Sequence, residues 1–204
     1  MNLYADFHTH RPREDALVSS REKPERGLWS LEVHPWHLPE RFRMPGETFF
    51  RDLRRADALG EIGLDRLRGP DITVQIRFLK ALLAAAEEAG KPVVVHAVRC
   101  DAELDAALRN FSGNVLIHGF RGSERRLLAH LALGRTVSLA PGAWTKYAGL
   151  LAGRGLDGIG LESDDTEEEI APIYLRAERE TGISGWAERC RENFRRFIGE
   201  GRER

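Results

Sequence analysis

The sequence predicts an α/β protein: a reduced TIM-like (β/α)8 barrel formed by one domain over residues 1–204. Two observations lead to this fold class. Short apolar runs closed by polar turns occur eight times, and in the later part of the chain they alternate with helical patterns. A parallel pair of strands needs a crossover that is usually a helix, and eight parallel strands are the number that closes a βα barrel.

The strands are predicted where apolar runs lie between turn residues. These runs are Leu3–His8, Ala16–Ser19, Trp29–Val33, Ala58–Ile62, Val93–His96, Val115–His118, Thr136–Ala140 and Gly158–Glu162. The segment from Arg11 to Gly27 is too short to hold a strand and a full crossover helix. One or two helices of the outer ring are therefore expected to be missing near the N-terminus.

The clearest helix is predicted over Ile72–Ala89, where apolar residues recur at helical spacing. Asp71 can cap its start, and Gly90 followed by Pro92 ends it. Further helices are predicted at Glu47–Arg55, Asp101–Arg109, Ser123–Leu133, Lys146–Leu151, Glu167–Glu180 and Ser184–Ile198.

The helix predicted to begin at Glu167 opens with an acidic run, which suits the positive end of a helix dipole. Asp165 or Thr166 is expected to cap it. The competing fold for the whole chain is an open doubly wound sheet. The chain has no glycine-rich phosphate-binding turn that would favour that sheet.

Composition excludes several classes of protein. With 42% apolar and 31% charged residues, the chain is neither disordered nor fibrous, and two cysteines exclude a disulfide scaffold. The net charge of −1 provides no overall positive field for nucleic acid. No apolar run approaches the roughly 20 residues of a membrane span. We therefore expect a cytoplasmic protein with no membrane contact and no obligate protein partner.

Residues that can bind a metal ion end several of the predicted strands. His8 and His10 share one face of the first strand, and His96 and His118 each close a separate apolar strand. Catalytic groups in βα barrels lie at the C-terminal ends of strands, so these imidazoles should meet at one rim. Glu61 and Asp164 follow the same rule, and a carboxylate can bridge two ions. This set predicts two divalent ions.

The same segments resemble the TatD family of metal-dependent hydrolases over nearly the whole chain. The resemblance lies in Asp6-Phe7-His8-Thr9-His10, Val33-His34-Pro35-Trp36, Gly60-Glu61-Ile62-Gly63-Leu64-Asp65, Val95-His96, Ile117-His118, Leu161-Glu162-Ser163-Asp164 and the closing Glu192–Phe197. It implies a TIM-like barrel of the amidohydrolase superfamily and hydrolysis of DNA phosphodiesters with two ions, which could be Zn²⁺, Mg²⁺ or Mn²⁺.

The resemblance also implies a role for each matching residue. One ion would take His8, His10 and Asp164, the second would take His96 and His118, and Glu61 would bridge them. His34 would face the substrate, where it could hydrogen-bond the phosphate or protonate the leaving group. Asp164 would accept the proton of the attacking water. Arg99 and Arg121, each three residues beyond a ligand histidine, could pair with a phosphate.

The chain departs from the family in the segments expected to contact the substrate. It has Gly119 and Arg121 where the family commonly has cysteine and serine, and Asp165-Thr166 where alanine and proline are common. The long loop that usually follows is absent. The alternative function is therefore hydrolysis of a small phosphoester, lactone or amide by the same centre.

Two further alternatives belong to other classes. One is a barrel that has lost catalysis and only binds, although all six predicted ligands are retained. The other is a phosphoesterase barrel of the polymerase-and-histidinol-phosphatase type, which also begins with His-x-His. The segment Gly60–Asp65 fits that type less well than it fits the TatD family.

Overall fold

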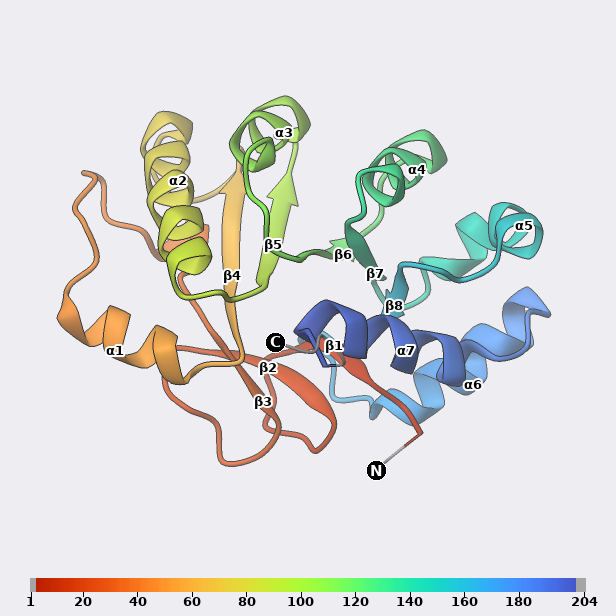
Figure 1. Cartoon of the computed structure of the whole chain (residues 1–204). Coiled ribbons are helices and arrows are strands. Elements are labelled where there is room, and N and C mark those ends of the chain that lie inside the picture. Colours follow the sequence, from red (N-terminus) through yellow and green to blue (C-terminus); the bar gives the residue numbers. More distant parts are fainter. Residues whose placement is uncertain (1–2, 201–204) are drawn as a thin grey trace.

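The computed structural model describes residues 3–200. Within them, eight parallel strands follow one another in chain order around a nearly closed barrel (Figure 1). They are β1 (Asp6–Thr9), β2 (Ala16–Ser20), β3 (Leu28–Leu31), β4 (Ala58–Asp65), β5 (Val93–Val98), β6 (Val115–Phe120), β7 (Thr136–Leu139) and β8 (Ile159–Leu161). The predicted fold class is confirmed.

The barrel closes where the chain after β8 meets β1. The backbone N–H of Asp164 donates to the carbonyl of His8 (3.0 Å), and the N–H of His10 donates to the carbonyl of Asp164 (3.4 Å). These bonds fix Asp164 directly beside the two histidines of the first strand. The closing contact therefore also positions part of the candidate site.

The helices lie outside the strands and alternate with them from β3 onward (Figure 1). They are the 3₁₀-helix η1 (Pro35–His37), α1 (Glu47–Arg55), α2 (Ile72–Glu88), α3 (Asp101–Leu108), α4 (Glu124–Ala132), α5 (Trp144–Arg154), α6 (Ile170–Thr181) and α7 (Trp186–Ile198). Within residues 3–200, no helix is both long enough and apolar enough to cross a membrane.

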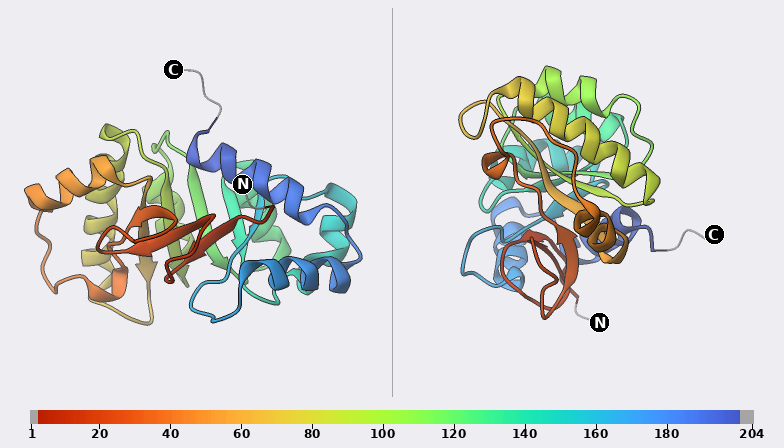
Figure 2. Two further views of the ribbon diagram at one scale, coloured as in Figure 1. Left: turned by 90° about the horizontal axis from the view of Figure 1, so that it is seen from below. Right: turned by 90° about the vertical axis from the view of Figure 1, so that its left-hand side faces the viewer.

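The barrel is thinnest where the sequence predicts missing helices. In the described chain, no helix connects β1 to β2 or β2 to β3, and the red segments of Figure 2 are strands and loops only. The β2–β3 loop instead lies against the strands: a Cβ on Gly27, at φ +86°, would be 2.8 Å from Val18 Cγ2. Trp29 is 3% exposed and donates its indole N–H to the carbonyl of Ser20 (3.1 Å). A loop and an indole thus replace the helical cover.

Helix α2 forms as its sequence predicts. The Asp71 carboxylate accepts a hydrogen bond from the backbone N–H of Thr73 (2.8 Å), which satisfies one of the free donors of the first turn. The apolar stripe packs on β4 and buries Leu79 and Leu82 at 1% exposure each. Burying such a side chain stabilises the fold by about 1.5–3 kcal/mol.

The start of α6 differs from the prediction. The helix begins at Ile170 after an N-cap residue, Glu169, that makes no side-chain capping bond, so neither Asp165 nor Thr166 is the cap. The reason is Arg13, whose guanidinium donates to the carbonyls of Glu167 (3.0 Å) and Glu168 (2.6 Å). These two carbonyls accept from Arg13 just before the helix, and residues 165–169 lie outside α6.

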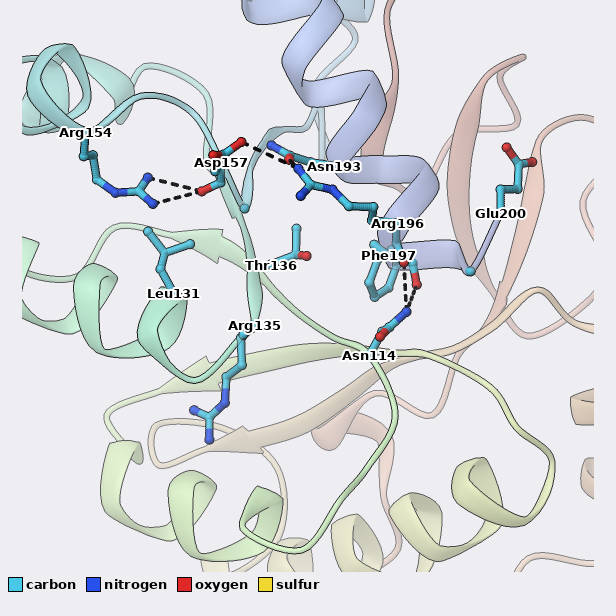
Figure 3. Close-up of a pocket in the computed structure, with 13 residues that line it drawn as sticks. Asn114, Leu131, Arg135, Thr136, Arg154, Asp157, Asn193, Arg196, Phe197 and Glu200 are labelled. Carbon is cyan, nitrogen blue, oxygen red and sulfur yellow. Dashed lines mark hydrogen bonds and ion pairs between the residues drawn. The ribbon is translucent and has the colours of Figure 1, made fainter. Parts of the chain in front are cut away.

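A cavity of about 480 Å³ lies at the N-terminal end of the strands (Figure 3). Its arginines are engaged within the fold: Arg154 donates to the carbonyl of Asp157 (3.1 Å), and Arg135 donates to Asp105 (2.6 Å) and contacts His130. The N-terminal face of such barrels serves stability, whereas reactions take place at the opposite rim. This cavity is accordingly part of the scaffold.

Candidate metal centre

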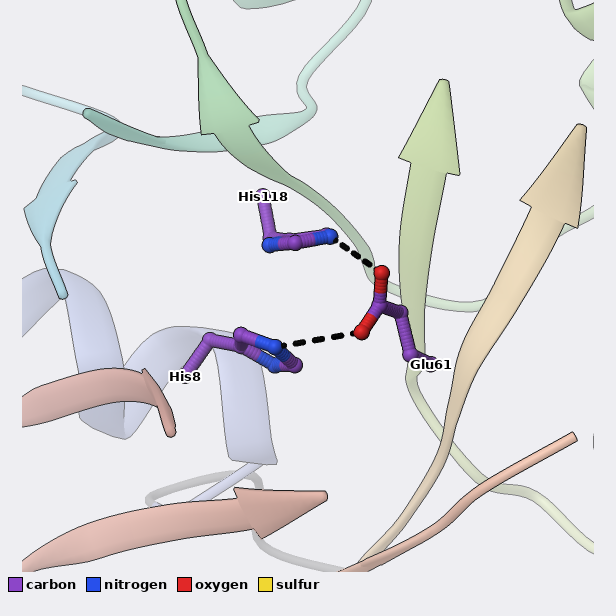
Figure 4. Close-up of side chains that lie close together, drawn as sticks. All are labelled: His8, Glu61 and His118. Atoms are coloured by element: carbon purple, nitrogen blue, oxygen red, sulfur yellow. Dashed lines mark hydrogen bonds and ion pairs between the residues drawn. The ribbon is translucent and has the colours of Figure 1, made fainter. Parts of the chain in front are cut away.

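The six predicted ligands come from five parallel strands that end at one rim. His8 lies on β1 and His10 directly after it, His96 and His118 lie on β5 and β6, Glu61 lies on β4, and Asp164 follows β8. Because the C-terminal ends of parallel strands meet, residues far apart in sequence come together there. The structure brings all six into one cluster, part of which is drawn in Figure 4.

Glu61 is the centre of this cluster, and its two oxygens face different histidines. Oε1 lies 2.7 Å from Nδ1 of His96 and 2.7 Å from Nε2 of His118. Oε2 lies 3.3 Å from Nε2 of His8 and 3.3 Å from Nε2 of His10. A carboxylate between two sets of imidazoles in this way can offer one oxygen to each set.

The backbone around Glu61 holds its side chain inside the barrel, where it is 2% exposed. Its N–H donates to the hydroxyl of Ser19 (2.9 Å), and the hydroxyl of Ser30 donates to the carbonyl of Gly60 (2.6 Å). Gly63 permits the close approach of β5, since a Cβ there would lie 2.0 Å from the carbonyl oxygen of His96. The Gly60–Asp65 segment therefore needs its small residues to bring Glu61 and His96 together.

Asp164 completes the half of the cluster formed by β1. Its Oδ1 lies 3.8 Å from Nε2 of His8, and its side chain is 34% exposed. Its backbone has a positive φ of 52°, a conformation that aspartate and asparagine tolerate better than most residues. Asp164 therefore combines contact with the cluster and contact with the open rim.

His34 enters the cluster as a hydrogen-bond donor. Its Nδ1 accepts from the backbone N–H of Trp36 (3.1 Å), so the proton of the neutral ring is on Nε2. That Nε2 lies 3.1 Å from Oε1 of Glu61, to which it can donate. A nitrogen that carries a proton is unavailable to a metal ion, so the geometry favours a role for His34 outside the ligand set.

Three carboxylates that the sequence analysis did not select lie behind the histidines. Asp65 Oδ2 is 3.1 Å from Nε2 of His96, Glu32 Oε2 is 3.6 Å from Nδ1 of His10, and Glu162 Oε1 is 3.6 Å from Nδ1 of His118. Such partners orient a ligand imidazole and increase its basicity. The sequence feature that could have identified these carboxylates is their place in the same short motifs, two to four residues from His34, Glu61 or Asp164.

The predicted phosphate-binding arginines lie farther out. Arg99 and Arg121 are exposed on the loops that follow β5 and β6. Neither is among the described residues that line the cavity over the cluster, which has a volume of about 300 Å³. They could meet only the part of a substrate that extends beyond this cavity.

The charges in the cluster shift the pKa values of its members. Burial would raise the pKa of Glu61, but the charge of His118 and hydrogen bonds with His10 and His118 hold it well below its usual range. Burial would lower the pKa of His118, but the charge of Glu61 raises it well above its usual range. For His10, hydrogen bonds with Glu32 and Glu61 outweigh burial and raise the pKa to about 10.

Unpartnered buried atoms show that a cation fits this cluster. His8 is fully buried, and neither of its ring nitrogens has a hydrogen-bond partner among the described residues. Leaving a buried polar atom unpaired costs about 1–3 kcal/mol. His8, His10 and Asp164 form one group that could hold an ion, and His8 with Glu61 and His118 forms another. Imidazole and carboxylate are ligands that Zn²⁺ and Mn²⁺ accept.

The distances between ligand atoms on the β1 side of the cluster, where His8, His10 and Asp164 lie, also agree with a cation site. Two ligand atoms bound tetrahedrally to one ion at about 2.1 Å lie about 3.4 Å apart. The contacts of His8 Nε2 with Glu61 Oε2 and with Asp164 Oδ1 are 3.3 and 3.8 Å. The contacts to Oε1 are shorter and have hydrogen-bond geometry. The β1 side therefore needs less rearrangement to accept an ion.

We expect binding of a divalent ion to release protons at pH 7. The raised pKa values of His10 and His118 leave protons on rings that must lose them to become ligands. Affinity should therefore increase with pH, by up to about tenfold per pH unit for each proton displaced. Titration calorimetry in two buffers of different ionisation enthalpy should detect at least one released proton. Affinity that is constant between about pH 6 and pH 9 would contradict this.

Glu162→Gln should weaken ion binding about 10–100-fold, because the neutral amide no longer supports His118 as a ligand. Glu162 is fully buried, and its other carboxylate oxygen accepts a hydrogen bond from Ser138. Ser138→Ala is the matched control, since it removes that bond but keeps the charge near His118. Calorimetric titration of both variants with one ion measures the difference. Equal losses of affinity would show that packing, and not the charge, matters.

The comparisons with known proteins show the family of this chain and agree with its fold. The family model described as TatD-related DNase matches residues 7–171. The crystal structure of YjjV, a TatD homologue from Escherichia coli K12, is similar with a TM-score of 0.68 and 20% identity, covering 97% of this chain and 96% of that one. A TatD family hydrolase from Entamoeba histolytica has a TM-score of 0.59 and 14% identity, covering 74% and 64%. No curated protein matches.

Proposed function

The chain belongs to the TatD-related DNase family of metal-dependent hydrolases, whose model matches residues 7–171, and from this premise we propose that it is a two-metal phosphodiesterase that cleaves DNA. The observation that carries the proposal is the bridging position of Glu61 between the pair His8 and His10 and the pair His96 and His118. We also propose that its 204 residues act as one catalytic domain. A cytoplasmic location remains a prediction.

In this proposal two divalent ions would be held by six residues: His8, His10, His96, His118, Glu61 and Asp164. When bound, such ions lower the pKa of a coordinated water toward 7 and neutralise charge that develops on the phosphate. Asp164 is the residue that takes the proton from the attacking water. Burial raises the pKa of its carboxyl in the metal-free site, and its 34% exposure gives it access to the rim.

His34 holds a hydrogen-bond donor at a fixed place beside the cluster. Its Nδ1 is occupied by the N–H of Trp36, so its Nε2–H is held toward Glu61 at the base of the cavity. From there it can donate a hydrogen bond to a phosphate oxygen of the substrate. We assign Arg99 and Arg121 to phosphates farther along the strand, because both lie outside the cavity over the cluster.

A small phosphoester is the second candidate substrate. The cavity of about 300 Å³ is at the lower end of the range for small-molecule sites, and the loops that follow β5 and β6 are short. The experiment that separates the two candidates measures hydrolysis of single-stranded DNA, a simple phosphodiester and a neutral ester with each ion that the protein retains. Turnover of the neutral ester alone would exclude the nuclease.

Arg121→Ala should raise KM for DNA and leave kcat largely unchanged, because Arg121 would hold a phosphate that does not react. The salt dependence of DNA binding should fall by about one phosphate contact. Hydrolysis of the simple phosphodiester should change little. Arg125→Ala, at an exposed arginine on α4, is the matched control. A loss of kcat on the simple phosphodiester would place Arg121 in the reaction itself.

A further inference from the structure

Trp36 is unlike the other tryptophans of this chain. It is 38% exposed, whereas Trp29 is 3% exposed and Trp144 and Trp186 are fully buried. It also lines the cavity over the metal centre, together with His34 and His96. A large aromatic ring at this place contacts both solvent and the space where a substrate must lie.

The ring of Trp36 is fixed to the metal centre by its polar atoms. Its indole N–H donates to Oδ2 of Asp65 (2.6 Å), and the same oxygen lies 3.1 Å from Nε2 of His96. Its backbone N–H donates to Nδ1 of His34 (3.1 Å). Because its donors are used within the protein, what the indole offers to a ligand is its flat π-surface.

That surface already holds a planar group. The guanidinium carbon of Arg68 lies 4.3 Å from the centre of the Trp36 ring, a cation–π contact. Arg68 is exposed, so the face that it covers can be reached from solvent. Leu67, which precedes it, is 60% exposed. The loop after β4 therefore presents an apolar and cationic surface beside the cavity.

We propose that Trp36 is the stacking platform for a nucleobase of single-stranded DNA, next to the phosphate that reacts. The base displaces Arg68, whose guanidinium then pairs with the adjacent phosphate. Aromatic side chains bind bases of single strands in this way, and guanidinium groups bind phosphate bidentately. This inference deepens the proposed function and rests on it, because the metal centre would hold the reacting phosphate. Trp36 would then favour single-stranded DNA, in which a base can unstack from its neighbours and lie on the indole.

The test uses the fluorescence of Trp36, the exposed indole. The ligands are a thymidine tetranucleotide with phosphorothioate linkages, which resist hydrolysis, and an abasic tetramer with the same linkages. The thymidine oligomer should protect Trp36 from collisional quenching by acrylamide, and the abasic oligomer should not. Trp36→Leu should weaken binding of the thymidine oligomer about tenfold or more and leave binding of the abasic oligomer unchanged.

Two further variants make the result specific. Trp36→Phe keeps an aromatic face but loses the bond to Asp65, so it should restore part of the preference for thymidine. Leu133→Ala, at a 62% exposed residue that ends α4, should bind like the unmodified protein. Arg68→Ala should lower the salt dependence of oligomer binding but keep the protection of Trp36. The metal content of each variant is measured alongside.

The outcomes separate this inference from the proposed function. Equal binding of both oligomers, or an unchanged preference for thymidine in Trp36→Leu, overturns the stacking platform even if the protein cleaves DNA. Protection of Trp36 by the thymidine oligomer supports the platform even if no phosphodiester is hydrolysed, and in that case it is the proposed hydrolysis that fails.

Discussion

Replacing Glu61 with glutamine should remove hydrolysis almost completely, with a loss of at least about a hundredfold in kcat/KM on any accepted substrate. The amide keeps the shape of the side chain but has only one oxygen. Its NH2 group must then face either the His8 and His10 side or the His96 and His118 side, where a donor replaces an acceptor. One ion loses its shared ligand, and the charge between both ions disappears.

Metal analysis should show this loss directly, because the retained ion count should fall in Glu61→Gln under conditions where the unmodified protein stays loaded. The matched control is Glu40→Gln, the same change at an exposed glutamate. The control should keep its ions and its rate. A Glu61→Gln protein that binds both ions and turns over normally would mean that Glu61 does not bridge them.

Much of the fold could be predicted because its signals are local. Each strand is a short apolar run bounded by turn residues, so all eight were located, although β1 begins at Asp6 and not at Leu3. The ends of α2 follow from Asp71 and from Gly90, which has a φ of +64°. The rim position of His8, His96 and His118 follows from one topological rule, because a residue that ends a parallel strand must lie at the reactive face.

What could not be predicted depends on contacts between distant segments. The start of α6 is set by Arg13, which lies about 155 residues before the carbonyls it binds. The proton on Nε2 of His34 follows from a backbone N–H that only the turn at Pro35 brings to Nδ1. The supporting roles of Asp65 and Glu162 depend on which ring nitrogen faces them, and strand periodicity does not specify this.

Asp164→Asn should cost several kcal/mol of transition-state stabilisation, at least about a hundredfold in rate, while most of the structure and one ion remain. Asparagine tolerates the positive φ of 52° at this position. The bonds between the backbone of Asp164 and that of His8 and His10 do not involve the side chain. The barrel should therefore close as before, and circular dichroism and thermal unfolding should change little.

The two variants should differ in the ions they lose. Among the described residues, Asp164 groups with His8 and His10, so Asp164→Asn should weaken one ion and spare an ion held by His96 and His118. Glu61→Gln should weaken both. Titration of each metal-free variant measures the number of sites. An identical loss of ions in both variants would mean that the cluster binds ions as a single unit.

The pH profile of Asp164→Asn identifies the base. Burial, and next the charge of Glu162, raise the pKa of Asp164, and a base works only when it is ionised. In the unmodified enzyme, kcat should fall as the pH drops through the pKa that Asp164 has in the metal-loaded site. The residual activity of Asp164→Asn should not show this decrease at low pH. Asp165→Asn, at the exposed neighbour that also lines the cavity, should keep it. If Asp164→Asn retains both ions and the full rate, Asp164 is not the base and another group must take the proton.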